Sequence, residues 1–141
     1  MSAATLHAEI VAAMVAAGFT SSPTTLAAQR MATTEAYGSG PSGSFVVGWG
    51  SRPLEGYTGN RQAQSRPVVT VSVLYDLGTD PNAGQAAALT AGDTVAAVLA
   101  NLTAGGGWTV TNIEHINFDD DRWQEVQVTA EGLHVVDLSS S

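Results

Sequence analysis

The chain has 141 residues, of which 13 are acidic and five basic, and it contains no cysteine. This length is typical of a single domain, and the absence of thiols excludes disulfides, thiolate metal sites and cysteine catalysis. The net charge of −8 argues against ordinary binding to nucleic acid, which needs a basic surface that neutralises phosphates.

The five basic residues are all arginines, and the charges are unevenly placed. Residues 1–75 hold four arginines and three acids, a net of +1, whereas residues 76–141 hold one arginine and ten acids, a net of −9. The sequence has no apolar run of the about 18 residues that a membrane-spanning helix needs. It also lacks the basic N-terminal segment of a signal peptide, so we expect a protein made in the cytoplasm.

The first predicted element is an amphipathic helix over residues 6–17. Thr5 is suited to cap it, and Gly18 is suited to end it. Its apolar residues fall on one stripe at helical spacing: Leu6, Ile10, Val11, Met14 and Val15. The following segment is rich in Ser, Thr, Gly and Pro, and it favours at most a short helix over residues 24–31.

Two strands are predicted next, separated by a long polar segment. Residues 44–50 favour a strand, and residues 67–75 favour one more strongly because they alternate β-branched side chains on one face. The segment between them, residues 51–66, is predicted to form a long loop. A loop of this length in a compact domain usually serves a function or is disordered.

A second helix is predicted to begin at Asp80, which serves as its N-cap, with Pro81 in the first turn. It extends to about Leu102. Gly84 and Gly92 each cost about 1 kcal/mol relative to alanine in a helix, so we expect a break near Gly92.

The chain is predicted to close with an antiparallel hairpin. Its strands cover residues 108–118 and 123–136, joined by the acidic loop 119–122, and Gly132 suggests a bulge in the second strand. Residues 137–141 are expected to form a flexible tail. The order of elements predicts a single α+β domain over 1–141, with a mostly antiparallel sheet of about four strands and two main helices.

Three adjacent aspartates, Asp119, Asp120 and Asp121, are the first candidate for chemistry. Carboxylate oxygens suit Mg²⁺ or Ca²⁺, but consecutive residues project in different directions, so a solvated turn is the favoured interpretation. The histidines offer no better site. If Phe118 pairs with Trp123, His115 lies opposite Val126, and the other two histidines lie elsewhere. We therefore predict no catalytic residue, metal or cofactor.

The three tryptophans, Trp49, Trp108 and Trp123, lie in or beside predicted strands. Exposed aromatic rings can stack on bases or sugars, but a place in the core or at a subunit interface fits these positions better. Trp49 and Trp123 are the candidates for an interface.

The segment 51–66 is the main candidate for contact between copies. It contains Tyr57 and the three arginines Arg52, Arg61 and Arg66. The acidic second half of the chain, with its three aspartates 119–121, offers a patch of opposite charge on a neighbouring copy. Complementary charge of this kind sets register and partner choice.

The order and length of these elements resemble the tail terminator proteins of long-tailed bacteriophages and related gene-transfer particles. The similarity rests on the helix Leu6–Ala17, the strand Val68–Tyr75, the helix Pro81–Leu102 and the hairpin Trp108–Val136. It implies a structural virion subunit that forms a ring, usually a hexamer, in the tail or neck. Such a ring caps the tail tube, meets the connector or stopper protein of the head, and lets genomic DNA pass through its lumen without specific binding.

Two alternatives remain open from the sequence. Another neck, head-closure or tail tube component of the same particle has similar size and element order. A small metal-dependent hydrolase or ligand-binding module that uses the aspartates 119–121 belongs to a different class. If the chain forms the ring that the resemblance implies, we expect no enzymatic activity and no membrane partner.

Overall fold

The computed structural model describes residues 2–21, 43–58, 61–78, 80–102, 108–118 and 122–138, with the backbone alone for 55–58 and 118. In these residues the chain forms two helices and two sheets, which confirms the α+β class and exceeds the predicted number of strands. The elements are α1 (Ala3–Ala16), β1 (Thr20–Ser21), β2 (Ser44–Trp49), β3 (Leu54–Thr58), β4 (Gln62–Ser65), β5 (Val68–Asp76), α3 (Pro81–Ala100), β6 (Trp108–Phe118), β7 (Trp123–Gly132) and β8 (His134–Asp137). The predicted helix over 24–31 lies outside the described residues.

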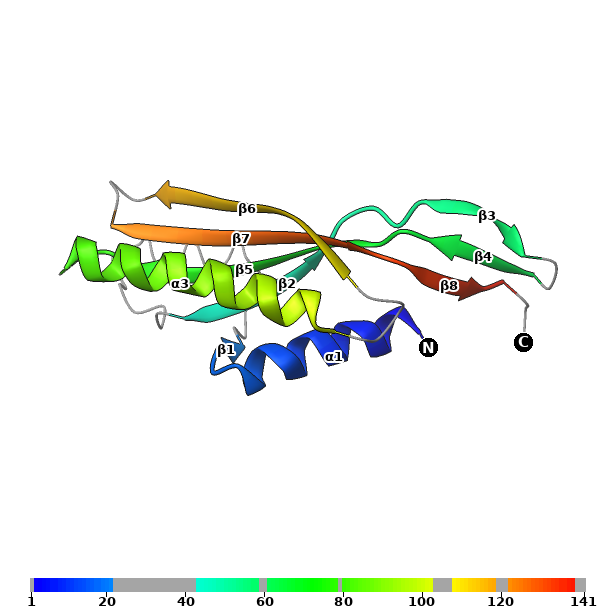
Figure 1. Ribbon diagram of the computed structural model, residues 1–141, viewed down its shortest axis with the longest axis horizontal. Coiled ribbons are helices and arrows are strands. Elements are labelled where there is room, and N and C mark those ends of the chain that lie inside the picture. The colour runs from blue at the N-terminus through cyan, green and yellow to red at the C-terminus, as the bar shows by residue number, and fades with distance from the viewer. Residues whose placement is uncertain are drawn as a thin grey trace.

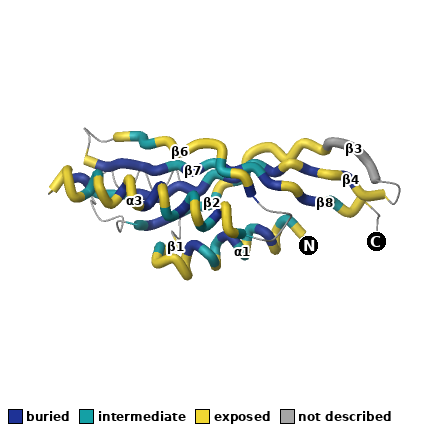
Figure 2. The backbone as a smooth tube through the Cα atoms, viewed as in Figure 1, coloured by how far each residue is buried: buried dark blue, intermediate teal, exposed yellow. Residues whose placement is uncertain are grey.

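The larger sheet has five strands in the order β1-β2-β5-β7-β6, and both helices cover one of its faces (Figure 1). α3 packs on β5, β6 and β7, whereas α1 lies beside α3, next to β1 and β2. The buried core lies between these layers and follows β5 and β7, as the dark tube in Figure 2 shows. β-branched residues dominate β5 because their side chains pack well on a pleated, buried surface.

α1 begins three residues earlier than its predicted start. The cap is Ser2 instead of Thr5, because the Ser2 hydroxyl accepts a hydrogen bond from the Thr5 backbone N–H at 3.1 Å. Leu6, Ile10 and Met14 are buried, as their helical spacing predicted. Gly18 follows the helix with a φ of 99°, a left-handed conformation that glycine adopts without strain.

α3 begins as predicted, because Asp80 accepts a hydrogen bond from the Ala83 backbone N–H at 3.1 Å. It runs without the predicted break at Gly92. A β-carbon at that position would stand 3.1 Å from Ile113 Cγ2 and 3.4 Å from Val126 Cγ1. Gly92 therefore allows the helix to approach the sheet closely, and packing on the sheet offsets the helix propensity that glycine lacks.

The bulge lies in β6 and not at Gly132, where the sequence suggested it. The register of β6 with β7 shifts between Val110 and Asn112, which leaves Thr111 as the extra residue. Val110 pairs with Ala130 before the shift, and Ile113 pairs with Val128 after it. Val110 and Ile113 are three positions apart, so regular alternation would place them on opposite faces of the sheet. The extra residue in the bulge puts both of them on the helix-covered face.

The structure corrects the prediction of a loop over residues 51–66. This segment forms β3 and β4, which pair with each other, and β4 also pairs with β8. The strands depend on β8, a partner distant in the sequence, so local alternation did not reveal them. Asp137, placed by the sequence in a flexible tail, is the last residue of β8 and pairs with Gln62.

The smaller sheet, in the order β3-β4-β8, projects from one end of the body, and we call it the arm (Figure 1). β7 passes through Leu133 into β8, so a nearly continuous strand belongs to both sheets. Within the arm, Ala63 and Ser65 are fully buried and His134 is nearly so. The arm is thus a built extension of the fold with its own packed side.

Candidate assembly surface on the arm and at its base

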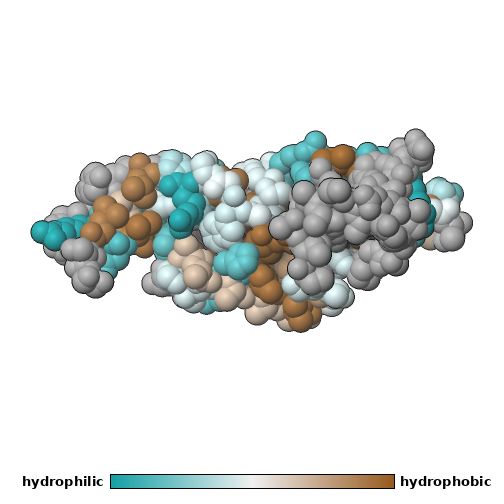
Figure 3. Space-filling model, turned by 180° about the vertical axis from the view of Figure 1, so that it is seen from behind, coloured by the Kyte–Doolittle hydropathy of each residue, from teal (hydrophilic) through white to brown (hydrophobic). Residues whose placement is uncertain are grey.

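The arm carries a group of exposed apolar side chains. Leu54 is 51% exposed and Val135 is 47% exposed. Leu133 and Leu138, which directly precede and follow β8, are exposed as well. Figure 3 shows apolar atoms, in brown, gathered at the arm end of the molecule on the left of that view. Leu54 pairs with Ser65 and Val135 pairs with Gln64, so these two side chains lie on opposite faces of the arm. Exposed apolar groups on the surface of an acidic protein favour contact with a partner.

The strand order of the arm adds a second means of contact. β3 and β8 are the outer strands of the small sheet. Outer strands present backbone N–H and C=O groups to any chain that lies alongside them, and proteins usually blunt such edges. The arm therefore offers both apolar side chains and strand edges to a partner.

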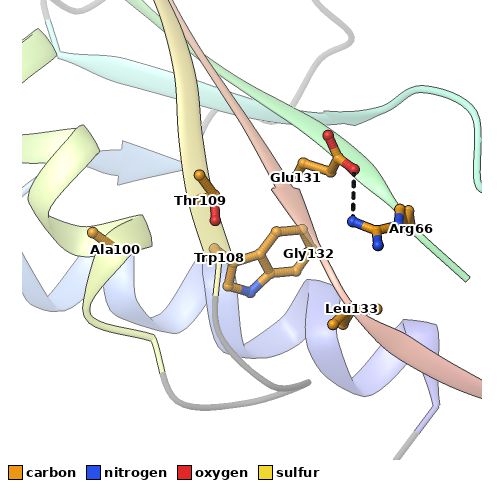
Figure 4. Close-up of a pocket in the computed structure, with 7 residues that line it drawn as sticks. All are labelled: Arg66, Ala100, Trp108, Thr109, Glu131, Gly132 and Leu133. Carbon is orange, nitrogen blue, oxygen red and sulfur yellow. Dashed lines mark ion pairs between the residues drawn. The ribbon is translucent and has the colours of Figure 1, made fainter.

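A hollow of about 390 Å³ lies at the base of the arm, where β7 passes into β8 (Figure 4). Trp108, Gly132 and Leu133 line it, together with Ala100 from the end of α3. Arg66 Nη1 lies 3.6 Å from Glu131 Oε1 across the rim, and both side chains are partly exposed. The lining thus combines the apolar side chains of Trp108 and Leu133 with the charged pair Arg66 and Glu131, and protein–protein contacts commonly mix such groups.

A row of three aromatic rings joins this hollow to α1. The indole Nε1 of Trp49 donates a hydrogen bond to Nδ1 of His7 at 2.7 Å. The Trp49 ring meets the Trp108 ring edge to face at 6.1 Å between centroids. A second hollow, lined by Ala3, Ala4, His7, Trp49 and Arg52, lies on this side. This partner of His7 could not be predicted from the sequence, because Trp49 is 42 residues away.

The residues predicted to contact another copy lie at different places in the structure. Arg61 lies at the tip of the arm, whereas Arg52 and Arg66 lie at its base, and all three are exposed. Tyr57 belongs to β3 and pairs with Ala63, but its side chain is outside the described structure. Trp49 is partly buried in the aromatic row.

Two further predictions concern residues away from the arm. Trp123 is fully buried within the subunit, which corrects its predicted place at an interface between copies. The guanidinium carbon of Arg122 lies 5.5 Å from the centroid of the Trp123 ring. Nε of Arg122 also lies 4.0 Å from Oδ1 of Asp76. Asp119, Asp120 and Asp121 lie outside the described residues, so their predicted contact stays a prediction.

The histidines lie apart from one another. His115 pairs opposite Val126, as the predicted register required. His134 belongs to the arm, opposite Ser65, and His7 contacts Trp49 on α1. In the part of the chain that the structure describes, no three His, Asp or Glu side chains are grouped to hold a metal ion.

A polar network crosses the interface between α3 and the sheet. Gln85 and Gln124 exchange two amide hydrogen bonds of 3.0 and 2.9 Å. Gln124 also contacts Nδ1 of His115 at 2.9 Å and donates to Asn117 at 2.6 Å. Because Gln124 is buried, these partners satisfy its amide, and the network fixes the first turns of α3 on β6 and β7. Its geometry explains packing without requiring chemistry.

Neither helix of the described chain is both long enough and apolar enough to cross a lipid bilayer. The sequence matches no protein-family model and no curated protein.

Proposed function

We propose that this chain is a structural subunit that assembles with copies of itself through the arm. The observation that carries this proposal is the arm itself: a three-stranded sheet that projects from the body with exposed Leu54, Val135 and Leu138. The arm lies outside the main core cluster of the five-stranded sheet and its helices. Its apolar groups are covered only when another surface packs on them.

The assembly that fits best is a closed ring. An arm that contacts a different surface of the next copy makes a head-to-tail contact, and repeated head-to-tail contacts form a ring when their rotation closes. The size and element order support a tail terminator of a long-tailed bacteriophage or related gene-transfer particle. The ring, proposed as a hexamer, caps the tail tube protein and meets the connector or stopper protein in the neck of the virion.

The charge of the chain suits this role. Each copy carries a net charge of −8, so a hexamer carries six times that, or −48. An acidic lumen repels the phosphate backbone and keeps transiting DNA from sticking. The proposal includes no bond-making chemistry, and it places the protein in the tail or neck of the particle after assembly in the host cytoplasm.

Light scattering after size-exclusion chromatography tests the assembly, alone and with the tail tube protein. Val135→Glu places a charge in the proposed contact, and we expect it to abolish ring formation while the melting temperature stays close to the wild-type value. Val15→Glu is the matched control, because Val15 is 52% exposed and lies on α1. The control should assemble like wild type. A wild-type chain that stays monomeric in every mixture would refute the proposal.

Electron microscopy of particles distinguishes the terminator from related components. We expect density for this subunit in one ring at the head-proximal end of the tail tube. Density in the tube layers would identify a tube protein, and density next to the portal would identify a head-closure protein. Particles that lack the subunit should carry tails of uncontrolled length if it ends tube growth.

A further inference from the structure

One side of α3 forms an exposed surface beside the edge strand β6. Gly92 approaches Ile113, and Ala100 lines a hollow with Trp108, so this side of the helix faces β6. Leu89 and Asp93 lie on the same side by helical spacing. Leu89 is 52% exposed and Ile113 is 38% exposed. We call Leu89, Asp93 and Ile113 the α3–β6 face.

The α3–β6 face and the arm carry side chains of opposite charge. Asp93 is the charged residue within α3, and no Lys or Arg lies in α3 or β6. Glu114 of β6 pairs with Gln127, so it points to the other face of the sheet and takes no part in the α3–β6 face.

The arm presents Arg61 at its tip, with exposed apolar groups behind it. Asp137 of β8 pairs with Gln62 beside Arg61, so the complementarity is between the single side chains Arg61 and Asp93 and not between whole surfaces. An opposite pair of this kind sets the orientation and partner of a contact.

The backbone at Arg61 supports a role for this side chain. Thr58 pairs with Gln62, so three residues connect β3 to β4, and the last of them, Arg61, has a φ of 55°. Glycine is the usual residue at a left-handed position of a three-residue hairpin connection. Strained backbone at a non-glycine residue is typical of functional positions. Here the residue with this backbone conformation is an exposed arginine at the end of the arm.

The arm and the α3–β6 face of one chain cannot meet. The arm extends beyond the C-terminal end of α3 and points away from the body (Figure 1). Seven residues of helix, at about 1.5 Å each, separate Asp93 from that end. The acceptor for the arm is therefore on another copy, and the contact joins two different surfaces.

We infer that the arm of each copy docks on the α3–β6 face of the next copy, with Arg61 next to Asp93. This inference rests on the proposed function and adds the receiving surface. It yields a head-to-tail contact, the type that closes a ring.

Cysteine cross-linking tests the contact directly, because the chain contains no cysteine of its own. In the double variant Arg61→Cys with Asp93→Cys, oxidation should link neighbouring copies and give a ladder of covalent multimers on a non-reducing gel. The matched control combines Arg61→Cys with Glu9→Cys, a position on α1, and should give no ladder. Reduction should return every band to the monomer.

Charge reversal provides a second readout. We expect Arg61→Glu to raise the concentration needed for half-assembly about tenfold, and Arg61→Glu with Asp93→Arg to restore much of the loss. Arg61→Glu with Glu9→Arg restores the net charge without restoring the pair, and it should stay impaired. Melting temperatures of all variants report whether each one folds.

The outcomes separate this inference from the proposed function. Wild-type rings without a ladder in the 61–93 pair, or an equal ladder in the control pair, overturn the docking and leave the ring intact. Failure of the swapped pair to recover, with both variants folded, also overturns it. A wild-type chain that never assembles overturns both.

Discussion

The indole of Trp108 on β6 lies over Gly132 on β7, so closely that a β-carbon at position 132 would stand 2.7 Å from two ring atoms. The ring is nearly buried and also packs against Trp49 in an edge-to-face contact. We expect Gly132→Ala to lower the free energy of unfolding by about 1–3 kcal/mol, because a rigid buried ring has little room to move. Urea unfolding followed by circular dichroism measures this change.

Gly48 provides the control for that substitution. It lies within β2, it is exposed, and a β-carbon there would stand 3.8 Å from the Thr70 carbonyl oxygen, an ordinary contact. Gly48→Ala should raise the free energy of unfolding by about 0.5 kcal/mol, because glycine weakens strands. If the two substitutions changed the free energy of unfolding equally, the Trp108 ring would be able to move aside at little cost, contrary to this prediction.

Gly84 in α3 should resist a substitution that helix propensity alone favours. A β-carbon there would stand 2.7 Å from the backbone oxygen of Asp76. We expect Gly84→Ala to destabilise the fold by about 1–3 kcal/mol, although alanine exceeds glycine in helix propensity by about 1 kcal/mol. Thr90→Ala, at an exposed position of the same helix, should stabilise by a few tenths of a kcal/mol. Thermal melting compares the two, and a gain for Gly84→Ala would contradict the packing described.

Arg61→Gly should separate stability from assembly. Glycine relieves the left-handed backbone, which costs a non-glycine residue about 1–2 kcal/mol, so the melting temperature should rise. The same change removes the cation at the tip of the arm, so ring formation should weaken. Arg61→Ala keeps the strain and loses the charge, and it should weaken assembly without the gain in stability. Full assembly of both variants would exclude a role for this guanidinium.

Tyr75 should make stability depend on pH in the alkaline range. Burial raises the pKa of its hydroxyl above the ordinary value of 10.0. Above that pH the unfolded chain loses this proton while the folded chain keeps it, so the free energy of unfolding falls as pH rises. From about pH 9 to about pH 11 the wild type should lose more stability than Tyr75→Phe. Parallel loss in both proteins, measured by urea unfolding, would assign the effect to other groups.

The best sequence predictions concern elements whose signals are local. The Asp80 cap with its proline marked the start of α3, and alternating β-branched residues marked β5. The hairpin register that places His115 opposite Val126 followed from a short connection between its strands. Each signal acts within a few residues, where the chain has few alternatives.

The arm could not be predicted in the same way. β4 has the sequence Gln-Ala-Gln-Ser, which has little preference for strand, and it forms because β3 and β8 pair on either side of it. The candidate surface depends on that pairing, since it brings Leu54 and Val135 into one small sheet. The hydrogen bond between His7 and Trp49 likewise joins segments far apart in the sequence.

The sequence by itself determined the α+β class, the ends of α3, the main strands and the acidic balance, because these follow from local spacing, capping and composition. Only the tertiary structure decided that residues 51–66 become part of an arm, that Gly92 allows close packing, and that Trp123 lies inside. The physical reason is that pairing between distant strands and burial of side chains are properties of the assembled chain, and they override weak local preferences.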